Sequence, residues 1–344
     1  MNGQAQGILN RLRAVAKERG VTTDHALARW TAERFLARLS ASEHASRLVL
    51  KGAYVFTLWH GDLMRSTLDV DLHGYETDMV RICDILLAVA AASRDDDGLY
   101  FVVAEARFKP LVGSRLAGLR LLLPARLGSA HITLKIDLGF GHAITPGPDV
   151  LWYPSLLPGF PSFRIHAYPR ETVVAEKLAV MAEFGRDNTR VRDYYDLWVL
   201  SRRYSFHGHV LLDAIHQTFA GRDAHRFVQR RDGYWEAAFS EDFVTPKLER
   251  SWRNWVDDHA PTARPPELSQ VVAAVASFGV PLLNAVREGE ALAKRWAPTT
   301  GWRSSYGKML PHRPPEYAVR PSTPYLAVVD GGHPGTEERF PLSR

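Results

Sequence analysis

A short run of alternating residues near position 70 places the strongest constraint on how this chain folds. Polar and apolar side chains alternate through Arg65-Ser66-Thr67-Leu68-Asp69-Val70-Asp71. Side chains in a strand point to opposite faces in turn, so the pattern predicts a strand with Asp69 and Asp71 on one face and apolar residues on the other. The two aspartates then lie about 6 to 7 Å apart at the backbone.

Two carboxylates held this close repel each other unless a cation lies between them. Hard oxygen ligands suit Mg²⁺, or Mn²⁺ in its place, and Mg²⁺ typically binds one or two protein carboxylates together with substrate phosphates. The pair therefore predicts a metal site. The alternative is an exposed strand face that carries two acids and no ion, and the pair alone does not decide between the two.

Composition limits the class of protein. At 344 residues the chain is long enough for two domains, or for one domain with a large appendage. The chain has a single cysteine, Cys83, which excludes an internal disulfide framework. We expect no apolar signal core and no membrane span, and we therefore predict a cytoplasmic protein. The formal charge of +5 is compatible with a nucleic-acid partner.

Hydrophobic spacing predicts an α/β first half. Two opening helices cover residues 8–40, and the apolar run at 48–50 predicts a strand that leads through a glycine turn into a helix from Tyr54 to Trp59. A helix is predicted at about 78–92, and further strands are predicted at 67–73, 99–108, 118–123 and 131–138.

Prolines between residues 146 and 161 predict a linker, after which the spacing becomes helical. Helices are predicted at 171–184, 190–202, 208–219, 233–239, 245–259 and 266–286. Beyond about residue 298 a tail rich in proline, glycine and serine lacks the apolar spacing of a core. The predicted divisions are therefore 1–45, 46–150, 151–297 and 298–344.

The glycine turn at Lys51-Gly52-Ala53 is a candidate phosphate site. A chain that leaves a strand and enters a helix presents unpaired backbone N–H groups and a positive helix terminus to an anion. An ordinary strand-to-helix turn explains the same residues. The acidic strand follows 17 residues after Gly52, which is the length of a helical return that brings two strands together.

Asp137 is a third candidate carboxylate. It lies on the polar face of the alternating strand predicted at 131–138, and glycines at 139 and 141 follow, as expected where a ligand or another backbone comes close. If this strand neighbours the one with Asp69 and Asp71, three carboxylates converge for two metals. A solvated strand face is the alternative.

Two features of the helical half carry charge onto apolar faces. Lys177 shares the apolar side of its helix with Val173, Val180, Met181 and Phe184, so it either extends its ammonium to solvent or bridges to a nucleotide phosphate. Asp193 and Asp196 lie beside an apolar stripe on the next helix. They could receive a proton from an attacking hydroxyl, or pair with Arg190 and Arg192 as surface ion-pair supports.

Together these segments resemble the AbiEii/AbiGii nucleotidyltransferases, the toxin halves of bacterial toxin–antitoxin and phage-defence systems. The likeness runs from Glu33 to about residue 285 and includes five motifs in order. These are Glu33-Arg34-Phe35-Leu36-Ala37-Arg38-Leu39-Ser40, Arg65-x-Thr67-x-Asp69-x-Asp71, Lys135-Ile136-Asp137-Leu138-Gly139-Phe140-Gly141, Ala175-Glu176-Lys177-Leu178 and Asn188-Thr189-Arg190-Val191-Arg192-Asp193-Tyr194-Tyr195-Asp196-Leu197-Trp198.

The resemblance implies a minimal, polymerase-β-like nucleotidyltransferase domain, with a mixed sheet and flanking helices, followed by an α-helical domain that closes over the nucleotide. It implies metal ligands at Asp69, Asp71 and Asp137, and a catalytic acid at Asp193 or Asp196. The expected contacts to nucleotide phosphates are Lys51, Gly52, Ala53, Arg65, Thr67 and Lys177. Ala53 stands where many members have Gly, Ser or Thr, so a hydroxyl contact is lost there.

The expected activity is Mg²⁺-dependent transfer of a nucleoside monophosphate from an NTP to an RNA 3′ end, the tRNA acceptor, which blocks translation. A cognate antitoxin protein is the expected partner. One alternative keeps the NTP but uses a protein or small-molecule acceptor, and another is a nucleotide-binding protein without catalysis. Thr67, two residues before Asp69, is also a position where a regulatory modification would affect the site.

Overall fold

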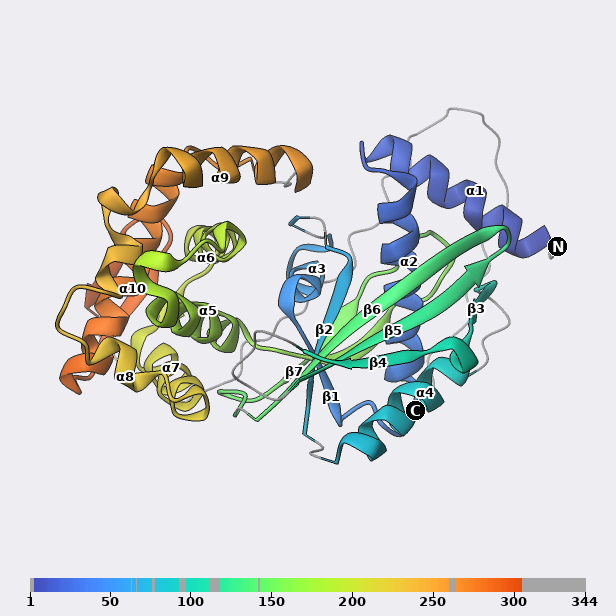
Figure 1. Ribbon diagram of the computed structural model, residues 1–344, viewed down its shortest axis with the longest axis horizontal. Coiled ribbons are helices and arrows are strands. Elements are labelled where there is room, and N and C mark those ends of the chain that lie inside the picture. Colours follow the sequence, from blue (N-terminus) through green and yellow to red (C-terminus); the bar gives the residue numbers. More distant parts are fainter. Residues whose placement is uncertain are drawn as a thin grey trace, which may run out of the picture. The chain divides into compact units, whose positions relative to one another are not determined.

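The computed structural model describes residues 3–62, 64–65, 67–75, 78–92, 97–111, 118–141, 143–259 and 264–304 (Figure 1). The helices are α1 (Gly3–Glu18), α2 (Thr23–Ser40), α3 (Val55–His60), α4 (Met79–Ala91), α5 (Arg170–Phe184), α6 (Val191–Arg203), α7 (Gly208–Arg222), α8 (His225–Val228), α9 (Pro246–His259) and α10 (Leu268–Glu288). The strands are β1 (Leu48–Lys51), β2 (Asp69–Gly74), β3 (Leu99–Phe101), β4 (Arg107–Pro110), β5 (Gly118–Leu127), β6 (Ala130–Phe140), β7 (Asp149–Tyr153), β8 (Phe163–Ala167), β9 (Phe206–His207), β10 (Lys294–Ala297) and β11 (Gly301–Ser304).

Among the described residues, eight strands form one mixed sheet. The hydrogen-bonded order is β3-β5-β6-β2-β1-β8-β7, with β4 also paired to β5. Strand β2 runs parallel to β6 and antiparallel to β1, while β1 runs parallel to β8. The prediction of a mixed α/β sheet followed by helices is confirmed.

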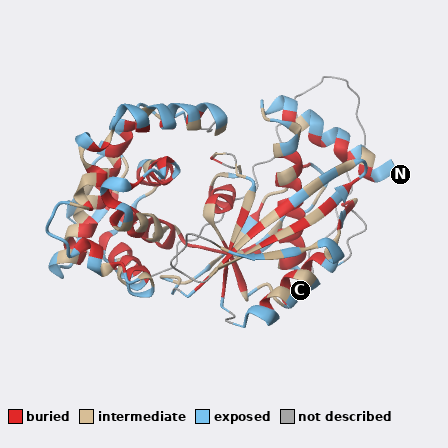
Figure 2. Ribbon diagram, viewed as in Figure 1, coloured by how far each residue is buried: buried red, intermediate tan, exposed pale blue. Residues whose placement is uncertain are grey.

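One face of the sheet is buried; the other is accessible over β4 to β6 and covered near β1, where Val49 and His73 are at most 1% exposed. Alternate residues of β6, such as Leu134, Ile136 and Leu138, are buried, and α1 and α2 pack on that side, with α4 against α2 (Figure 2). The residues between them on β6 are partly exposed or exposed. This alternation is the period-2 pattern read from the sequence, and it leaves the face with Asp69, Asp71 and Asp137 accessible.

Capping residues define where two helices of the buried layer begin. The Thr22 hydroxyl accepts a hydrogen bond from the His25 backbone N–H at 3.2 Å, at the start of α2. The Asp78 carboxylate accepts from the backbone N–H groups of Val80 and Arg81 at 2.9 and 3.3 Å, at the start of α4. Each cap satisfies donors that would otherwise have no partner in the helix.

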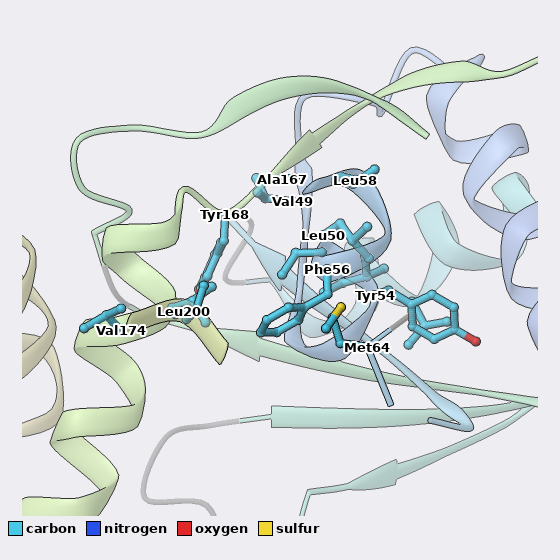
Figure 3. Close-up of a cluster of buried hydrophobic side chains, with 14 of the residues drawn as sticks. Val49, Leu50, Tyr54, Phe56, Leu58, Met64, Ala167, Tyr168, Val174 and Leu200 are labelled. Carbon is cyan, nitrogen blue, oxygen red and sulfur yellow. The ribbon is translucent and has the colours of Figure 1, made fainter. Parts of the chain in front are cut away.

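The helical segment packs on the sheet through a continuous apolar core. Figure 3 shows Val49 and Leu50 of β1 beside Phe56 of α3, with Val174 of α5 and Leu200 of α6 in the same cluster. All five side chains are at most 1% exposed. The core therefore holds α5 and α6 against the part of the sheet where the acidic strand lies.

The proline-rich segment is not the linker that its composition predicted. It contains β7, which pairs with β8 just after the segment, and β8 extends the sheet beside β1. Helix α2 fixes this segment: the Glu33 carboxylate accepts hydrogen bonds from the Ser155 hydroxyl and the Leu156 backbone N–H, both at 2.8 Å. Prolines are tolerated here because they lie between or beside the paired residues.

Other differences from the predicted elements are local. The strand predicted at 99–108 is two strands, β3 and β4, separated by the short 3₁₀ turn Val103–Glu105. The helix predicted at 233–239 is reduced to the 3₁₀ turn Glu236–Phe239. Strands β9, β10 and β11 form a small antiparallel sheet that was not predicted, and β11 lies within the predicted tail. The rest of the tail, from residue 305, is outside the described residues.

Helix α10 is long and apolar enough, by length and composition, to cross a membrane, which differs from the expectation that the chain has no such stretch. Half of its most apolar window is buried inside the fold. Its residues Val271, Val275 and Leu282 are fully buried, and the helix contacts α6 and α7. A core helix passes the same test, so this feature is weak support for a membrane span.

Replacing Glu33 with alanine should destabilise the protein by about 3 to 5 kcal/mol, because Arg34, 1% exposed, would lose its buried partner and Leu156 its acceptor. The free energy of unfolding from urea titration measures the change. The matched control is Glu43→Ala, at an exposed position, which should change stability by less than about 0.5 kcal/mol. Equal effects of the two substitutions would contradict the assigned role of Glu33.

Candidate functional site

Three carboxylates share the open face of two neighbouring strands. In the register of β2 with β6, Asp71 lies opposite Asp137 and Asp69 lies opposite Lys135. Cross-strand partners point to the same face. The condition for the three carboxylates to lie together, that the two acidic strands are neighbours, is therefore met by a parallel pairing that the spacing of the residues did not itself specify.

Arg120 of β5 neutralises part of this acidic surface. Its Nε and Nη2 atoms each donate to one oxygen of Asp137 at 2.6 Å, and Nη2 lies 3.6 Å from Asp69 Oδ2. Hydrogen bonding to Asp137 raises the pKa of Arg120, so the guanidinium stays charged. Lys135 adds a second positive charge, with Nζ 3.9 Å from Asp69 Oδ1.

The chemistry of Asp69 and Asp71 fits a hard divalent cation. Asp69 Oδ1 is buried and accepts no hydrogen bond from the described residues. Burial raises the pKa of Asp71; the charge of Lys51 opposes this effect and that of Asp137 adds to it. A buried carboxylate and an oxygen without a donor are the groups that a bound cation stabilises.

Asp137 is less available than its two neighbours, because both of its oxygens accept from Arg120. Within the described part of the chain, no group of three or more His, Cys, Asp or Glu side chains is arranged to hold a metal ion. The donor set present is thus the Asp69 and Asp71 pair. A carboxylate has about four lone-pair sites, and Arg120 occupies two of those on Asp137. Asp137 can therefore offer a metal ion only the remaining sites.

Gly52 is required by the position of Asp71. A Cβ atom added at Gly52 would lie 2.0 Å from Asp71 Oδ2, and the glycine has a φ of +67°. Only a residue without a side chain allows this backbone conformation and this approach. The turn that joins β1 to the 3₁₀ segment Gly52–Tyr54 therefore lies directly against the carboxylate pair.

Lys51 connects the sheet to helix α5. It lies opposite Asp71 in the β1–β2 register, and its Nζ is 3.6 Å from Glu176 Oε1. The Tyr168 hydroxyl donates to the same oxygen at 3.3 Å and lies 3.1 Å from His73 Nδ1. A Cβ at Gly139 would be 3.3 Å from Lys51 Nζ, so the group near this glycine is a lysine side chain and not the ligand or backbone that was predicted.

A second cluster of charges lies between the segment before β2 and helices α5 and α6. The Lys177 Nζ atom is 2.8 Å from Asp193 Oδ1 and 2.7 Å from Asp196 Oδ2. Arg65 donates from Nε and Nη2 to the two oxygens of Asp196 at 2.9 and 3.1 Å. Arg190 donates from Nε to Asp193 Oδ2 at 2.7 Å. We call these five residues the ion-pair cluster.

Mutual attraction outweighs burial in the ion-pair cluster. Burial alone would raise the pKa of Asp193, but Lys177 and Arg190 hold it well below its ordinary value of 3.8. Burial likewise would raise the pKa of Asp196, and Arg65 and Lys177 lower it. Both carboxylates are therefore ionised and paired, which favours the ion-pair alternative over a role as proton acceptor, although the two aspartates are buried and not on the surface.

The two groups of charges are close to each other. The charges of Arg65 and Arg192 both oppose the rise in the pKa of Asp71. Of the two pairings predicted for Asp193 and Asp196, the described residues show the one with Arg190 and not the one with Arg192. The Tyr195 hydroxyl of α6 also donates to the Met64 carbonyl at 3.0 Å, just before Arg65. Thr67 Oγ1 donates to the Asp69 carbonyl at 3.4 Å. Helix α6 therefore helps to hold the chain that leads into the acidic strand.

Sequence reasoning missed Arg120, Glu176 and Tyr195 as members of this region. Arg120 lies on the polar face of an alternating strand, which was a usable signal, but only the β5–β6 register places it opposite Asp137. Glu176 and Tyr195 stood inside recognised motifs without an assigned role.

The sequence profile of the nucleotidyl transferase AbiEii toxin family, described as a type IV toxin–antitoxin system, matches residues 34–274. This chain belongs to that family. Its fold is similar to a crystal structure from Helicobacter pylori provisionally described as a nucleotidyltransferase, with 16% identity, a TM-score of 0.44 and coverage of 78% of this chain and 97% of that one. A crystal structure of JHP933 from Helicobacter pylori is similar at 14% identity and a TM-score of 0.42, covering 78% and 94%. No curated protein matches the sequence.

Replacing Gly52 with alanine should reduce nucleotidyl transfer by at least about 100-fold, because the added Cβ displaces the Asp71 carboxylate. Gly61→Ala is the matched control: Gly61 also has a positive φ, of +76°, but no atom lies within 4 Å of the added Cβ. Both variants should lose about 1 to 2 kcal/mol of stability from backbone strain. Equal transfer rates for the two variants would contradict the contact with Asp71.

Replacing Lys177 with methionine should destabilise the protein by about 3 to 5 kcal/mol at pH 7, because two buried carboxylates lose a shared cation. The pKa values of Asp193 and Asp196 are lower in the folded state than in the unfolded chain, so their ionisation stabilises the fold above pH 3.8. This contribution is lost as the pH falls. The difference from the wild type should therefore shrink below about pH 4. Urea titrations at several pH values measure it, with exposed Lys247→Met as the control. A difference independent of pH would contradict the assignment.

Proposed function

We propose that this chain transfers a nucleoside monophosphate from an NTP to an RNA 3′ end, the acceptor end of tRNA, as the toxin of a toxin–antitoxin pair. The observation that carries the proposal is the open-face pair Asp69 and Asp71, with Gly52 against Asp71 and Asp137 in register beside it. The RNA acceptor rests on the resemblance to family members that add nucleotides to tRNA.

In the proposed reaction the RNA 3′ hydroxyl loses its proton to water and its oxygen forms a bond to the α-phosphorus of the NTP. The bond from that phosphorus to the bridging oxygen breaks, so that pyrophosphate leaves. Asp69 and Asp71 would hold Mg²⁺, with Asp137 contributing a free lone pair. When bound, this ion would neutralise charge on the transferring phosphoryl group and lower the pKa of the attacking hydroxyl. The protein's own groups position the two reactants.

Positive groups near the carboxylates provide the phosphate contacts. Backbone N–H groups at Gly52 and Ala53 and the side chain of Lys51 would face the triphosphate at the turn. Lys177 has three ammonium donors and two carboxylate neighbours, so one donor is left for a phosphate oxygen. Arg65 and Thr67 would act at the entrance to β2, where Arg65 holds Asp196.

Transfer should fall by at least about 1,000-fold in Asp69→Asn and in Asp71→Asn, because an amide cannot replace the charge of a metal ligand. The assay incubates the protein with each of the four α-labelled NTPs, total tRNA and Mg²⁺, and counts label on RNA. Exposed Asp84→Asn of α4 is the matched control and should retain full transfer.

Absence of label on RNA with every NTP, from folded wild-type protein, would contradict the proposed function. Label on protein or on a small metabolite would instead assign a different acceptor. Replacing Mg²⁺ with EDTA should abolish transfer and Mn²⁺ should restore it, since both ions prefer oxygen ligands.

A further inference from the structure

The open face of the sheet carries a row of basic side chains that begins at the acidic site. On β5, Arg120 lies between Asp137 of β6 and Lys109 of β4. Two residues along β5, Leu122 lies between Lys135 of β6 and Arg107 of β4. Farther along the same face Arg126 lies opposite His131 and Tyr100. We call the set Tyr100, Arg107, Lys109, Arg120, Arg126, His131 and Lys135 the basic face.

The basic face is accessible. Arg107, Lys109 and His131 are exposed, Tyr100 is 66% exposed, and the Arg126 and Lys135 side chains are 54% and 41% exposed. The helices α1 and α2 pack on the opposite side of the sheet, with α4 against α2 (Figure 1). Among the residues that the structure describes, Arg107 and Lys109 form no ion pair, and Arg126 has only a 3.8 Å contact with Glu105.

The basic face extends along β6 away from the three carboxylates. Asp137 and His131 are six residues apart on β6, which corresponds to about 20 Å along the strand. Asp69, Asp71 and Asp137 lie at one end of this face, basic residues continue from there, and Glu105 is an acid beside Arg126 at the far end. A polyanion whose end reaches the carboxylates would therefore lie along positive charge.

We infer that the basic face binds the sugar-phosphate backbone of the RNA acceptor, so that its duplex stem lies over β3 to β6 while its 3′ end reaches Asp69 and Asp71. This inference rests on the proposed function. Duplex RNA is bound mainly through its backbone and shape, to which a broad row of arginine, lysine and one exposed tyrosine is suited. Charge complementarity over this length favours RNA over a compact metabolite as the acceptor.

The test is equilibrium binding of fluorescent tRNA, without NTP, over a series of salt concentrations. The variant is R107Q/K109Q/R126Q, which leaves every residue placed at the carboxylates intact. The matched control R13Q/K17Q/R81Q removes the same charge from exposed positions on α1 and α4, on the other side of the sheet.

We expect the basic-face variant to bind tRNA at least about 10-fold more weakly at 0.15 M salt, with a log–log salt slope smaller by about 2 to 3, since each lost phosphate contact removes about 0.7 to 0.9. The control should stay within twofold of the wild type. Transfer to a short single-stranded RNA that ends in the acceptor sequence should be unchanged in the variant.

Unchanged tRNA affinity in the basic-face variant would overturn the inference and would leave an acidic protein as the occupant of this face. An equal loss in the control would also overturn it, because net charge alone would then explain binding. Failure of the proposed function is distinguishable: if the wild type transfers no nucleotide to RNA but the variant still loses tRNA affinity, the basic face remains an RNA-binding surface.

Discussion

The ion-pair cluster is the interaction on which the candidate site depends. Arg65 belongs to the segment that enters the acidic strand, whereas Lys177, Arg190, Asp193 and Asp196 belong to or precede the helices packed beside it. Because Lys177 and the two aspartates are largely buried, removing one member of the cluster leaves a buried charge with fewer partners. The cluster therefore ties the position of Asp69 and Asp71 to that of α5 and α6, and Tyr195 reinforces this link through the Met64 carbonyl.

Much of the fold was predictable from periodicity. Alternation at β2 and β6 and helical spacing in α5, α6 and α10 each reflect one buried face, so they are visible in a single sequence. Strands β7 and β8 were missed because prolines around them indicate a loop, and their place is fixed by tertiary contacts such as Glu33 to Leu156. Local composition carries no information about a partner more than a hundred residues away.

The sequence was sufficient to predict which residues belong to the candidate site, but not which of them pair with each other. Asp69, Asp71 and Asp137 could be assigned to one polar face from alternation, while their adjacency depends on a parallel register. The spacing placed Lys177 on an apolar face, but its partners are two carboxylates from another helix, and Phe184 of that face is 38% exposed. Arg120 and the basic face emerge only when β4, β5 and β6 are aligned, since each strand alone contributes a few unremarkable basic residues.

A double-mutant cycle between Arg65 and Asp196 tests most directly whether the ion-pair cluster holds the acidic strand in its working position. The free energy of unfolding and the rate of nucleotidyl transfer would be measured for Arg65→Met, Asp196→Asn, the double variant and the wild type. The structure predicts a coupling energy of about 1.5 kcal/mol or more, and a loss of transfer in each single variant. Additive stabilities within about 0.5 kcal/mol, with transfer retained in Arg65→Met, would contradict this account.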